Sequence, residues 1–209
     1  VTQRGRLMHE KCSPGKMLSL LVDEQTACQL IGPEHRDMAI AAVNGPQTMV
    51  ISGTDESITA LIPKLETQEI PFKCLPGRVA FHTPSVEPIL SDLKMAVERV
   101  NPKPLKIPLI SNTTGKMIQL GQRLDADYWQ QHSRGTVQFY TSMETLFAET
   151  NIVALEIGPK PTLTRLAKQC APPIAVDCIA SLNSKQADEA AMLTAVSYTH
   201  LRAHETPLY

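Results

Sequence analysis

Aromatic side chains and an excess of charge of one sign are both lacking in this sequence. Of its 209 residues, 4% are aromatic, and 20 Lys and Arg residues are offset by 21 Asp and Glu residues, for a formal net charge of −1. A protein that binds nucleic acid needs a basic stripe or aromatic platforms on which bases stack. Apolar runs of the roughly 20 residues that cross a bilayer are also absent. We therefore expect neither nucleic acid nor a membrane as a partner.

Paired cysteines and glycine-rich phosphate loops are missing as well. The five cysteines include no Cys-x-x-Cys pair, which predicts reduced core thiols in a cytoplasmic protein rather than a disulfide framework or a zinc site. They are Cys12, Cys28, Cys74, Cys170 and Cys178. Neither Gly-x-Gly-x-x-Gly nor Gly-x-x-x-x-Gly-Lys occurs, so we expect no bound nucleotide cofactor and no metal.

The hydrophobic pattern of residues 17–76 predicts a small unit of helices and strands. Short apolar runs alternate with amphipathic stretches in the order strand, helix, strand, strand, helix, strand. The six segments are KMLSLLV, DEQTACQLI, MAIAAVN, TMVISG, DESITALIPKLETQ and IPFKCL. This β-α-β-β-α-β order is typical of a ferredoxin-like subdomain.

Residues 77–195 follow a different pattern and predict a larger α/β subdomain. Apolar residues at helical spacing predict one amphipathic helix over residues 84–100, and later strands such as NIVALEIG alternate with helices such as TLTRLAKQC. Such alternation favours a parallel sheet. Residues 1–16 are expected to end a helix of the same subdomain. Residues 196–209, VSYTHLRAHETPLY, interrupt the helical pattern and resemble a translated sequencing adapter, so we predict a foreign tail there.

His82 is a candidate general base because of the residues around it. It ends the short apolar run VAF and directly precedes Thr83 and Pro84, which suit the N-cap and the first position of a helix. The positive end of a helix dipole favours a neutral imidazole, and a general base must be neutral before it takes up a proton. The alternative is a packed histidine that is hydrogen-bonded to the backbone.

Five segments in register resemble the acyltransferase domain of modular polyketide synthases, close kin of malonyl-CoA:acyl-carrier-protein transacylases. They are AAVNGPQTMVISG, RVAFHTPSVEPIL, IPLISNTTGKMI, DADYWQQHSRGTVQF and VALEIGPKPTLTRL. The resemblance extends from Val1 to about Ala195. It implies an α/β fold, namely an incomplete α/β-hydrolase-like large subdomain with the ferredoxin-like subdomain inserted.

The resemblance also implies an activity. In this family a serine in a Gly-His-Ser-x-Gly elbow takes malonyl from malonyl-CoA, then passes it to the phosphopantetheine thiol of an acyl carrier protein. No cofactor is bound, and a ketosynthase domain is a neighbour in the parent chain. His82 matches the family's general base, and a main-chain carbonyl that orients its ring maps onto about His132.

Three further residues match substrate-binding positions of the family. Arg4 matches the arginine that binds the free carboxylate of malonyl groups with its planar fork. Phe81 would fill the space of an α-methyl group and so favour malonyl over methylmalonyl, although Val79 departs from the family's usual His; plain core packing is the alternative for Phe81. Asn44 could face the cleft, or could be a turn residue.

The serine nucleophile is missing from the sequence, because no Gly-x-Ser-x-Gly occurs in it. The resemblance places that serine upstream of residue 1, so we expect a C-terminal fragment that is catalytically silent by itself. Three alternatives remain open at this point. One is a free-standing malonyl-CoA:acyl-carrier-protein transacylase of fatty-acid synthesis, and another is a non-catalytic ferredoxin-like binding module. The third, suggested by the foreign-looking tail, is a remnant coded by a broken gene.

Overall fold

The chain forms two compact units, Val1–Ser142 and Met143–Tyr209, with the boundary inside helix α6 (Phe139–Phe147). The computed structural model describes residues 1–149, 152–170, 177–183 and 188–205. Both units combine helices with strands, which confirms the predicted α/β class.

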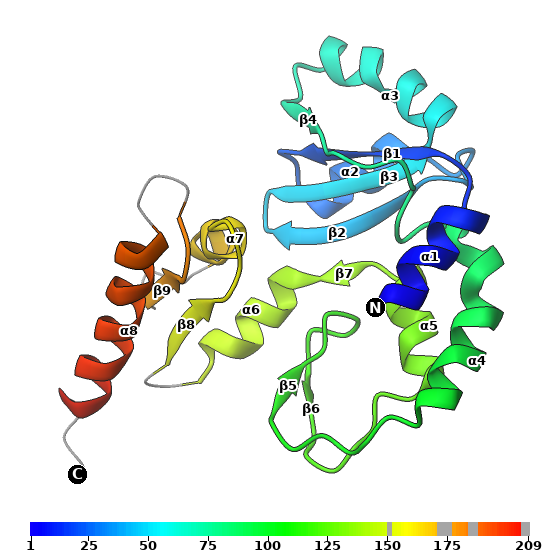
Figure 1. Ribbon diagram of the computed structural model, residues 1–209. Coiled ribbons are helices and arrows are strands. Elements are labelled where there is room, and N and C mark those ends of the chain that lie inside the picture. Colours follow the sequence, from blue (N-terminus) through cyan, green and yellow to red (C-terminus); the bar gives the residue numbers. More distant parts are fainter. Residues whose placement is uncertain (150–151, 171–176, 184–187, 206–209) are drawn as a thin grey trace. The chain divides into compact units, whose positions relative to one another are not determined.

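A five-stranded sheet lies in the first unit (Figure 1). Its elements are β1 (Gly15–Leu20), α2 (Glu24–Ile31), β2 (Ala39–Gly45), β3 (Thr48–Thr54), α3 (Asp55–Thr67), β4 (Phe72–Cys74) and β7 (Val137–Gln138). The strands lie in the order β4-β1-β3-β2-β7, and the first four pair antiparallel. The first six elements follow one another as the sequence predicts for the ferredoxin-like arrangement.

Alternating side chains of this sheet form the larger hydrophobic core. In β1, Leu18 and Leu20 are fully buried, whereas the residues beside them are half-buried or exposed, as expected for a strand with one covered face. Helices α2 and α3 pack on the same cluster, so both cover that face. The buried cluster consists of Leu18, Leu20, Val22, Ala27, Leu30, Met38, Val43, Met49, Ile51, Ile58, Leu61 and Leu65.

Strand β7 adds a parallel neighbour to β2, with Ala42 opposite Val137 and Val43 opposite Gln138. The Thr136 hydroxyl reinforces this pairing by donating to the carbonyl of Ile40 at 2.7 Å. Two strand residues begin this segment, and α6 follows directly. A two-residue strand has too short a pattern to be recognised from the sequence.

Three helical segments form a second, smaller core in the same unit, and a fourth packs beside them. They are α1 (Thr2–Lys11), the 3-10 helix η1 (Pro84–Ile89), α4 (Leu90–Val100) and α5 (Ala126–Arg134). Helix α1 packs against η1 and α4, and α5 packs against the same two (Figure 1). The core consists of Leu7, Met8, Val86, Ile89 and Leu93.

The single helix predicted over residues 84–100 is wrong in its first part. Residues Pro84–Ile89 form a 3-10 helix, and the α-helix begins at Leu90. Pro88 lies inside the 3-10 segment and has no N–H to donate to the carbonyl of Pro84, four residues earlier. An α-helical first turn is therefore disfavoured, although the apolar spacing continues through it.

A short antiparallel hairpin, β5 (Leu109–Ile110) with β6 (Met117–Ile118), lies between α4 and α5 in the sequence. Its turn includes Gly115 at φ 69°, in the left-handed region that favours glycine. The Ser111 hydroxyl lies 3.2 Å from the hydroxyl of Tyr128, which fixes this hairpin to α5.

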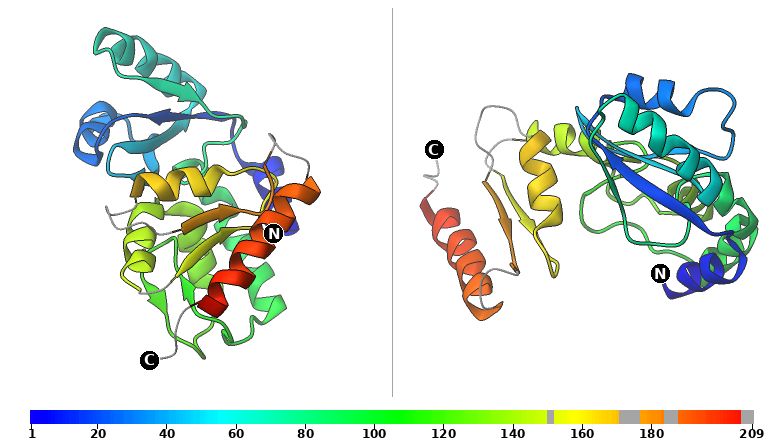
Figure 2. Two further views of the ribbon diagram at one scale, coloured as in Figure 1. Left: turned by 90° about the vertical axis from the view of Figure 1, so that its left-hand side faces the viewer. Right: turned by 90° about the horizontal axis from the view of Figure 1, so that it is seen from above.

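The second unit holds a parallel pair of strands, β8 (Val153–Glu156) and β9 (Asp177–Ala180), between helices α7 (Thr162–Cys170) and α8 (Asp188–Glu205) (Figure 2). Parallel pairing is as predicted for this part of the chain. Helix α8 continues past residue 196, so the predicted interruption there is wrong for the described residues. VSYTHLRAHE contains no Gly or Pro to break a helix.

Glu156, at the end of β8, caps helix α7. Its carboxylate accepts hydrogen bonds from the amides of Thr162 at 3.1 Å, Leu163 at 2.9 Å and Thr164 at 2.7 Å. Partial burial alone would raise the pKa of Glu156, but the bonds from the amides outweigh that effect, and the pKa lies below its usual value of 4.5. The charged carboxylate thus satisfies the free N–H groups at the start of α7.

The cysteines are less buried than predicted. Cys28 and Cys74 are exposed, and Cys12, Cys170 and Cys178 are half-buried; all five are free thiols. The prediction of core thiols is therefore wrong for the two exposed residues. Both lie on outward-facing positions of short elements, where the sequence pattern around them is too brief to define a face.

Candidate active site

Buried neighbours fix the backbone of His82. Ala80 and Thr83 are fully buried, and the Thr83 hydroxyl donates to the carbonyl of Ala80 at 2.7 Å and accepts from the amide of Ser85 at 3.2 Å. Thr83 is the N-cap of η1 and Pro84 its first residue, which confirms the predicted helix start. Between these residues His82 adopts φ 62°, a left-handed conformation that costs about 1–2 kcal/mol for a residue with a side chain.

The imidazole of His82 is oriented by the main chain of Gly135. Nδ1 of His82 lies 2.7 Å from the carbonyl oxygen of Gly135. The prediction that the carbonyl of His132 does this is wrong by three residues. Gly135 is the C-cap of α5 and has extended backbone angles, φ −80° and ψ 160°, so its carbonyl leaves the helix axis and becomes available to a side chain. A glycine directly after a helix is a recognised C-cap signal, so the sequence could have identified Gly135 as the helix end, although not as the partner of His82.

This contact determines which nitrogen of His82 can accept a proton. A carbonyl oxygen only accepts hydrogen bonds, so Nδ1 carries the proton and Nε2 keeps its lone pair. Burial lowers the pKa of His82, and the bond to Gly135 raises it. The positive charge of Arg4, and that of His132 whenever it is protonated, lowers it further, so the pKa is below the usual 6.5. The lowered pKa agrees with the prediction of a neutral ring. Its causes are burial and nearby charges, whereas the sequence predicted the helix dipole as the cause.

Two short connections tie the His82 segment and Gly135 to the five-stranded sheet. The amide of Gly15, the first residue of β1, donates to the carbonyl of Arg78 at 3.0 Å, and Pro14 forms a β-bridge with Val79. A side-chain carbon at Gly15 would lie 2.7 Å from Cβ of Ala80, so this close approach requires glycine. On the other side, β7 begins two residues after Gly135. The sheet thus fixes both partners of the His82 hydrogen bond.

Arg4 is half-buried and has no carboxylate as an ion-pair partner in the part of the chain that the structure describes. By contrast, the nearby Arg6 is exposed, and its Nε lies 3.7 Å from Oε1 of Glu10. Nη1 of Arg4 instead lies 3.4 Å from Nδ1 of His132. Removing a guanidinium from water without an anionic partner is unfavourable, so this arrangement favours an anionic ligand.

The His132 ring is held by aromatic neighbours on its own helix. Its centroid lies 5.4 Å from that of Trp129 and 6.0 Å from that of Tyr128. Burial first, and the charge of Arg4 second, lower the pKa of His132 below 6.5. The structure therefore brings Arg4, His132 and His82 together through their side chains, and the main chain of His132 is not part of the site.

Phe81 packs half-buried against the smaller core, whose members include Leu7 and Val86. Phe81 therefore has the core-packing role that the sequence left open as the alternative to substrate selection. In the sequence Phe81 directly precedes the candidate base His82. Its effect on the choice of acyl group stays a prediction.

Asn44 lies near the end of β2, where the register with β3 is irregular between Val43 and Gly45. It is half-buried and engaged in an interaction within the protein. Val43 pairs with Gln138 in β7, so Asn44 follows directly on the part of β2 that contacts β7. Its assignment to a cleft also stays a prediction.

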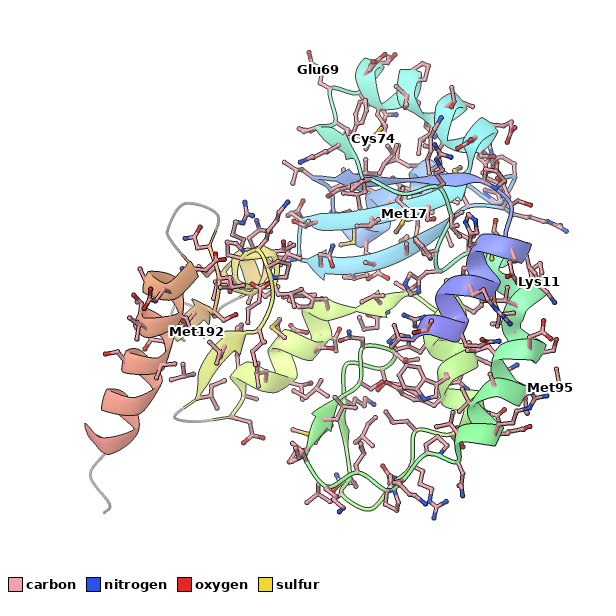
Figure 3. The ribbon with its side chains drawn as sticks, in the orientation of Figure 1. Lys11, Met17, Glu69, Cys74, Met95 and Met192 are labelled. Carbon is pink, nitrogen blue, oxygen red and sulfur yellow. The ribbon has the colours of Figure 1, made fainter. Side chains whose placement is uncertain are left out.

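A shallow groove of about 240 Å³ between α1 and α4 is distinct from the histidine site. Figure 3 labels Lys11 and Met95 on its two helices. Charges of both signs line it, and Lys11 forms an ion pair with Asp92. None of His82, Arg4 and His132 is among its lining residues.

Over the residues that the structure describes, no helix combines the length and apolarity needed to cross a membrane. Within the same residues, no three His, Cys, Asp or Glu side chains come together as a possible metal site.

Comparison with known proteins identifies the family. The acyl transferase domain family matches residues 1–206. This chain belongs to that family. The match confirms the resemblance inferred from the five sequence segments.

The relatives of this acyl transferase domain are polyketide synthases. Polyketide synthase GfsE of Streptomyces halstedii is 36% identical over 166 residues, which are 78% of this chain and 4% of that protein. The spectinabilin polyketide synthase system protein NorB of Streptomyces orinoci is 29% identical over 170 residues, 81% of this chain and 8% of that protein. The chain thus spans less than a tenth of either relative.

Solved acyltransferase structures share the fold. The acyl transferase domain of SpnD, in complex with 2-(pent-4-yn-1-yl)malonyl, superposes with a TM-score of 0.85 at 26% identity, over 94% of this chain and 48% of that one. A loading acyltransferase from the avermectin modular polyketide synthase gives 0.84 at 25% identity, over 96% of this chain and 64% of that one. This acyl transferase domain sequence therefore spans about half to two thirds of those chains.

Proposed function

We propose that this chain supplies the general base and the carboxylate-binding residue of a malonyl transfer site in a polyketide synthase. The observation that supports it is that two groups with suitable chemistry lie near enough for the charge of one to influence the other. One is a neutral His82 whose Nδ1 is bonded to Gly135, and the other is a half-buried Arg4 that has no carboxylate among the described residues. A malonyl group carries a free carboxylate, which can serve as the anionic partner of Arg4. The related SpnD domain is complexed with a malonyl derivative.

In the proposed reaction His82 acts through Nε2. It takes the proton of a serine hydroxyl as the serine oxygen bonds to the thioester carbonyl of malonyl-CoA; the carbon–sulfur bond breaks, and coenzyme A leaves with that proton. The phosphopantetheine thiol of an acyl carrier protein then gives its proton to Nε2 of His82 as its sulfur attacks the malonyl-serine ester. The ester carbon–oxygen bond breaks, and His82 passes that proton to the serine oxygen. The 209 residues contain no Gly-x-Ser-x-Gly, so the serine comes from a segment outside this sequence and the chain alone is inactive.

Substrate selection would involve two further residues. Phe81, which directly precedes His82 in the chain, would oppose an α-methyl group and favour malonyl over methylmalonyl by about 1–3 kcal/mol. Asn44, on the β2 end next to β7, would face the acyl group or its carrier. A ketosynthase domain and an acyl carrier protein are the expected partners in the parent chain.

The test uses a completed domain, in which the Gly-His-Ser-x-Gly half of a related acyltransferase precedes Val1. Mass spectrometry after incubation with malonyl-, methylmalonyl- or acetyl-CoA should detect mainly malonyl on the serine. His82→Ala should slow this acylation at least about 100-fold, because the serine loses its base. The matched control is His9→Ala, an exposed histidine on α1. Unchanged acylation in the His82 variant would refute the proposal and favour a binding module.

A further inference from the structure

The side chain of Arg4 must be held in one conformation before its guanidinium can bind a carboxylate selectively. Arg4 is on the first turn of α1, where the other residues from Thr2 to Arg6 are exposed. An arginine side chain loses much rotamer freedom when it is fixed, and a freely rotating fork would bind a carboxylate weakly. The contact that fixes it in this structure is the one to His132 on α5.

The geometry of that contact leaves a binding edge open. Nη1 of Arg4 approaches Nδ1 of His132 at 3.4 Å. A guanidinium has five N–H groups, and a carboxylate uses two parallel ones. The contact to His132 occupies one donor on Nη1, so the edge formed by Nε and Nη2 stays available for a ligand.

The contact also requires a particular form of His132. Arginine is only a donor, so Nδ1 of His132 must be the acceptor and the ring must be neutral, with its proton on Nε2. The half-burial of the ring and the adjacent positive charge both favour that neutral form. The packing of the ring near Trp129 and Tyr128 fixes its orientation.

We propose that the His132 ring positions the Arg4 guanidinium and thereby determines the preference for acyl groups with a free carboxylate. The inference rests on the proposed function and assigns His132 as a positioning residue that acts through Arg4. An acetyl group makes no use of Arg4, so its transfer does not depend on His132.

The experiment compares variants of the completed domain by kcat/KM for malonyl-CoA and for acetyl-CoA. His132→Leu removes the acceptor and should lower the malonyl value about tenfold, mainly through KM, because one hydrogen bond to a charged group is lost. The acetyl value should stay within about twofold. His132→Asn, whose side-chain oxygen can replace Nδ1, should stay within about threefold of the wild type for malonyl. His132→Ala also removes the acceptor and should lower the malonyl value in the same way. Its smaller side chain is tolerated at a half-buried helix end.

A double-variant cycle separates positioning from a structural role. In an Arg4→Met background, His132→Leu should change malonyl transfer by less than about twofold, since the guanidinium that it positions is gone. A loss of malonyl and acetyl transfer to the same extent, or an unchanged malonyl preference in both His132→Leu and His132→Ala, would overturn the inference. A wild-type domain that does not distinguish malonyl from acetyl would instead refute the proposed function, and the inference with it.

Discussion

At the scale of single residues, different neighbours determine the backbone, the orientation and the charge of His82. Ala80 and Thr83 hold its left-handed backbone, and the carbonyl of Gly135 orients the ring. Burial and the charge of Arg4 contribute to its lowered pKa. These effects come from separate parts of the chain, so each can be altered without the others.

The effect of Arg4 on the histidines can be measured directly. Arg4→Met removes a positive charge that lowers the pKa of both His82 and His132, so both values should rise toward 6.5. Titration of the imidazole carbon-bound protons by NMR on the 209-residue chain would record the shift. Arg6→Met, the exposed neighbour, should leave both titrations unchanged. Equal titration curves in wild type and Arg4→Met would show that Arg4 lies farther from the rings than in this structure.

At the scale of elements, the end of α5 serves two partners at once. The side chain of His132, within the last turn, contacts Arg4, whereas the carbonyl of Gly135, just after the helix, contacts His82. The helix start at Thr83 was predictable because a cap depends on adjacent residues. The role of Gly135 was not, since it depends on the pairing of β7 with β2, almost 100 residues away in the sequence.

The capping of α7 by Glu156 makes a prediction for the second unit. Glu156→Gln replaces a charged acceptor by an amide with one acceptor oxygen, so the N–H groups of Thr162–Thr164 lose part of their hydrogen bonding. A lost cap of this kind costs about 1 kcal/mol. Hydrogen exchange of these amides should therefore accelerate about fivefold. Glu149→Gln, an exposed carboxylate of the same unit, is the control, and equal exchange in the two variants would contradict the capping role.

At the scale of the whole molecule, regular patterns were predictable and close approaches were not. The order of the ferredoxin-like elements follows from the alternation of apolar residues in strands and their helical spacing in helices. The meeting of Arg4, His132 and His82 depends on the packing of α1, η1 and α5, which no local pattern encodes. The resemblance to known acyltransferases indicated Arg4 and His82, but it misplaced the carbonyl and left the ring of His132 without a role.

The two half-buried histidines, His82 and His132, make the stability of the fold depend on pH. Their pKa values are below 6.5 in the folded protein and near 6.5 in the unfolded chain, so the unfolded chain binds protons first as the pH falls. Stability is therefore full above pH 6.5 and decreases as the pH drops through the folded values. Urea unfolding between pH 8 and pH 5 should show this decrease. A His82→Asn, His132→Asn double variant should have a flatter profile, and an equally steep one would assign the decrease to other groups.

The left-handed backbone at residue 82 has a consequence for any search for thermostable variants. Glycine and asparagine adopt that conformation more readily than histidine, so either could relax the local backbone. Neither can bind a proton near neutral pH. Selection for heat resistance alone would then enrich replacements at this position that remove the base of the proposed acyl transfer, and a useful library would have to keep histidine fixed there.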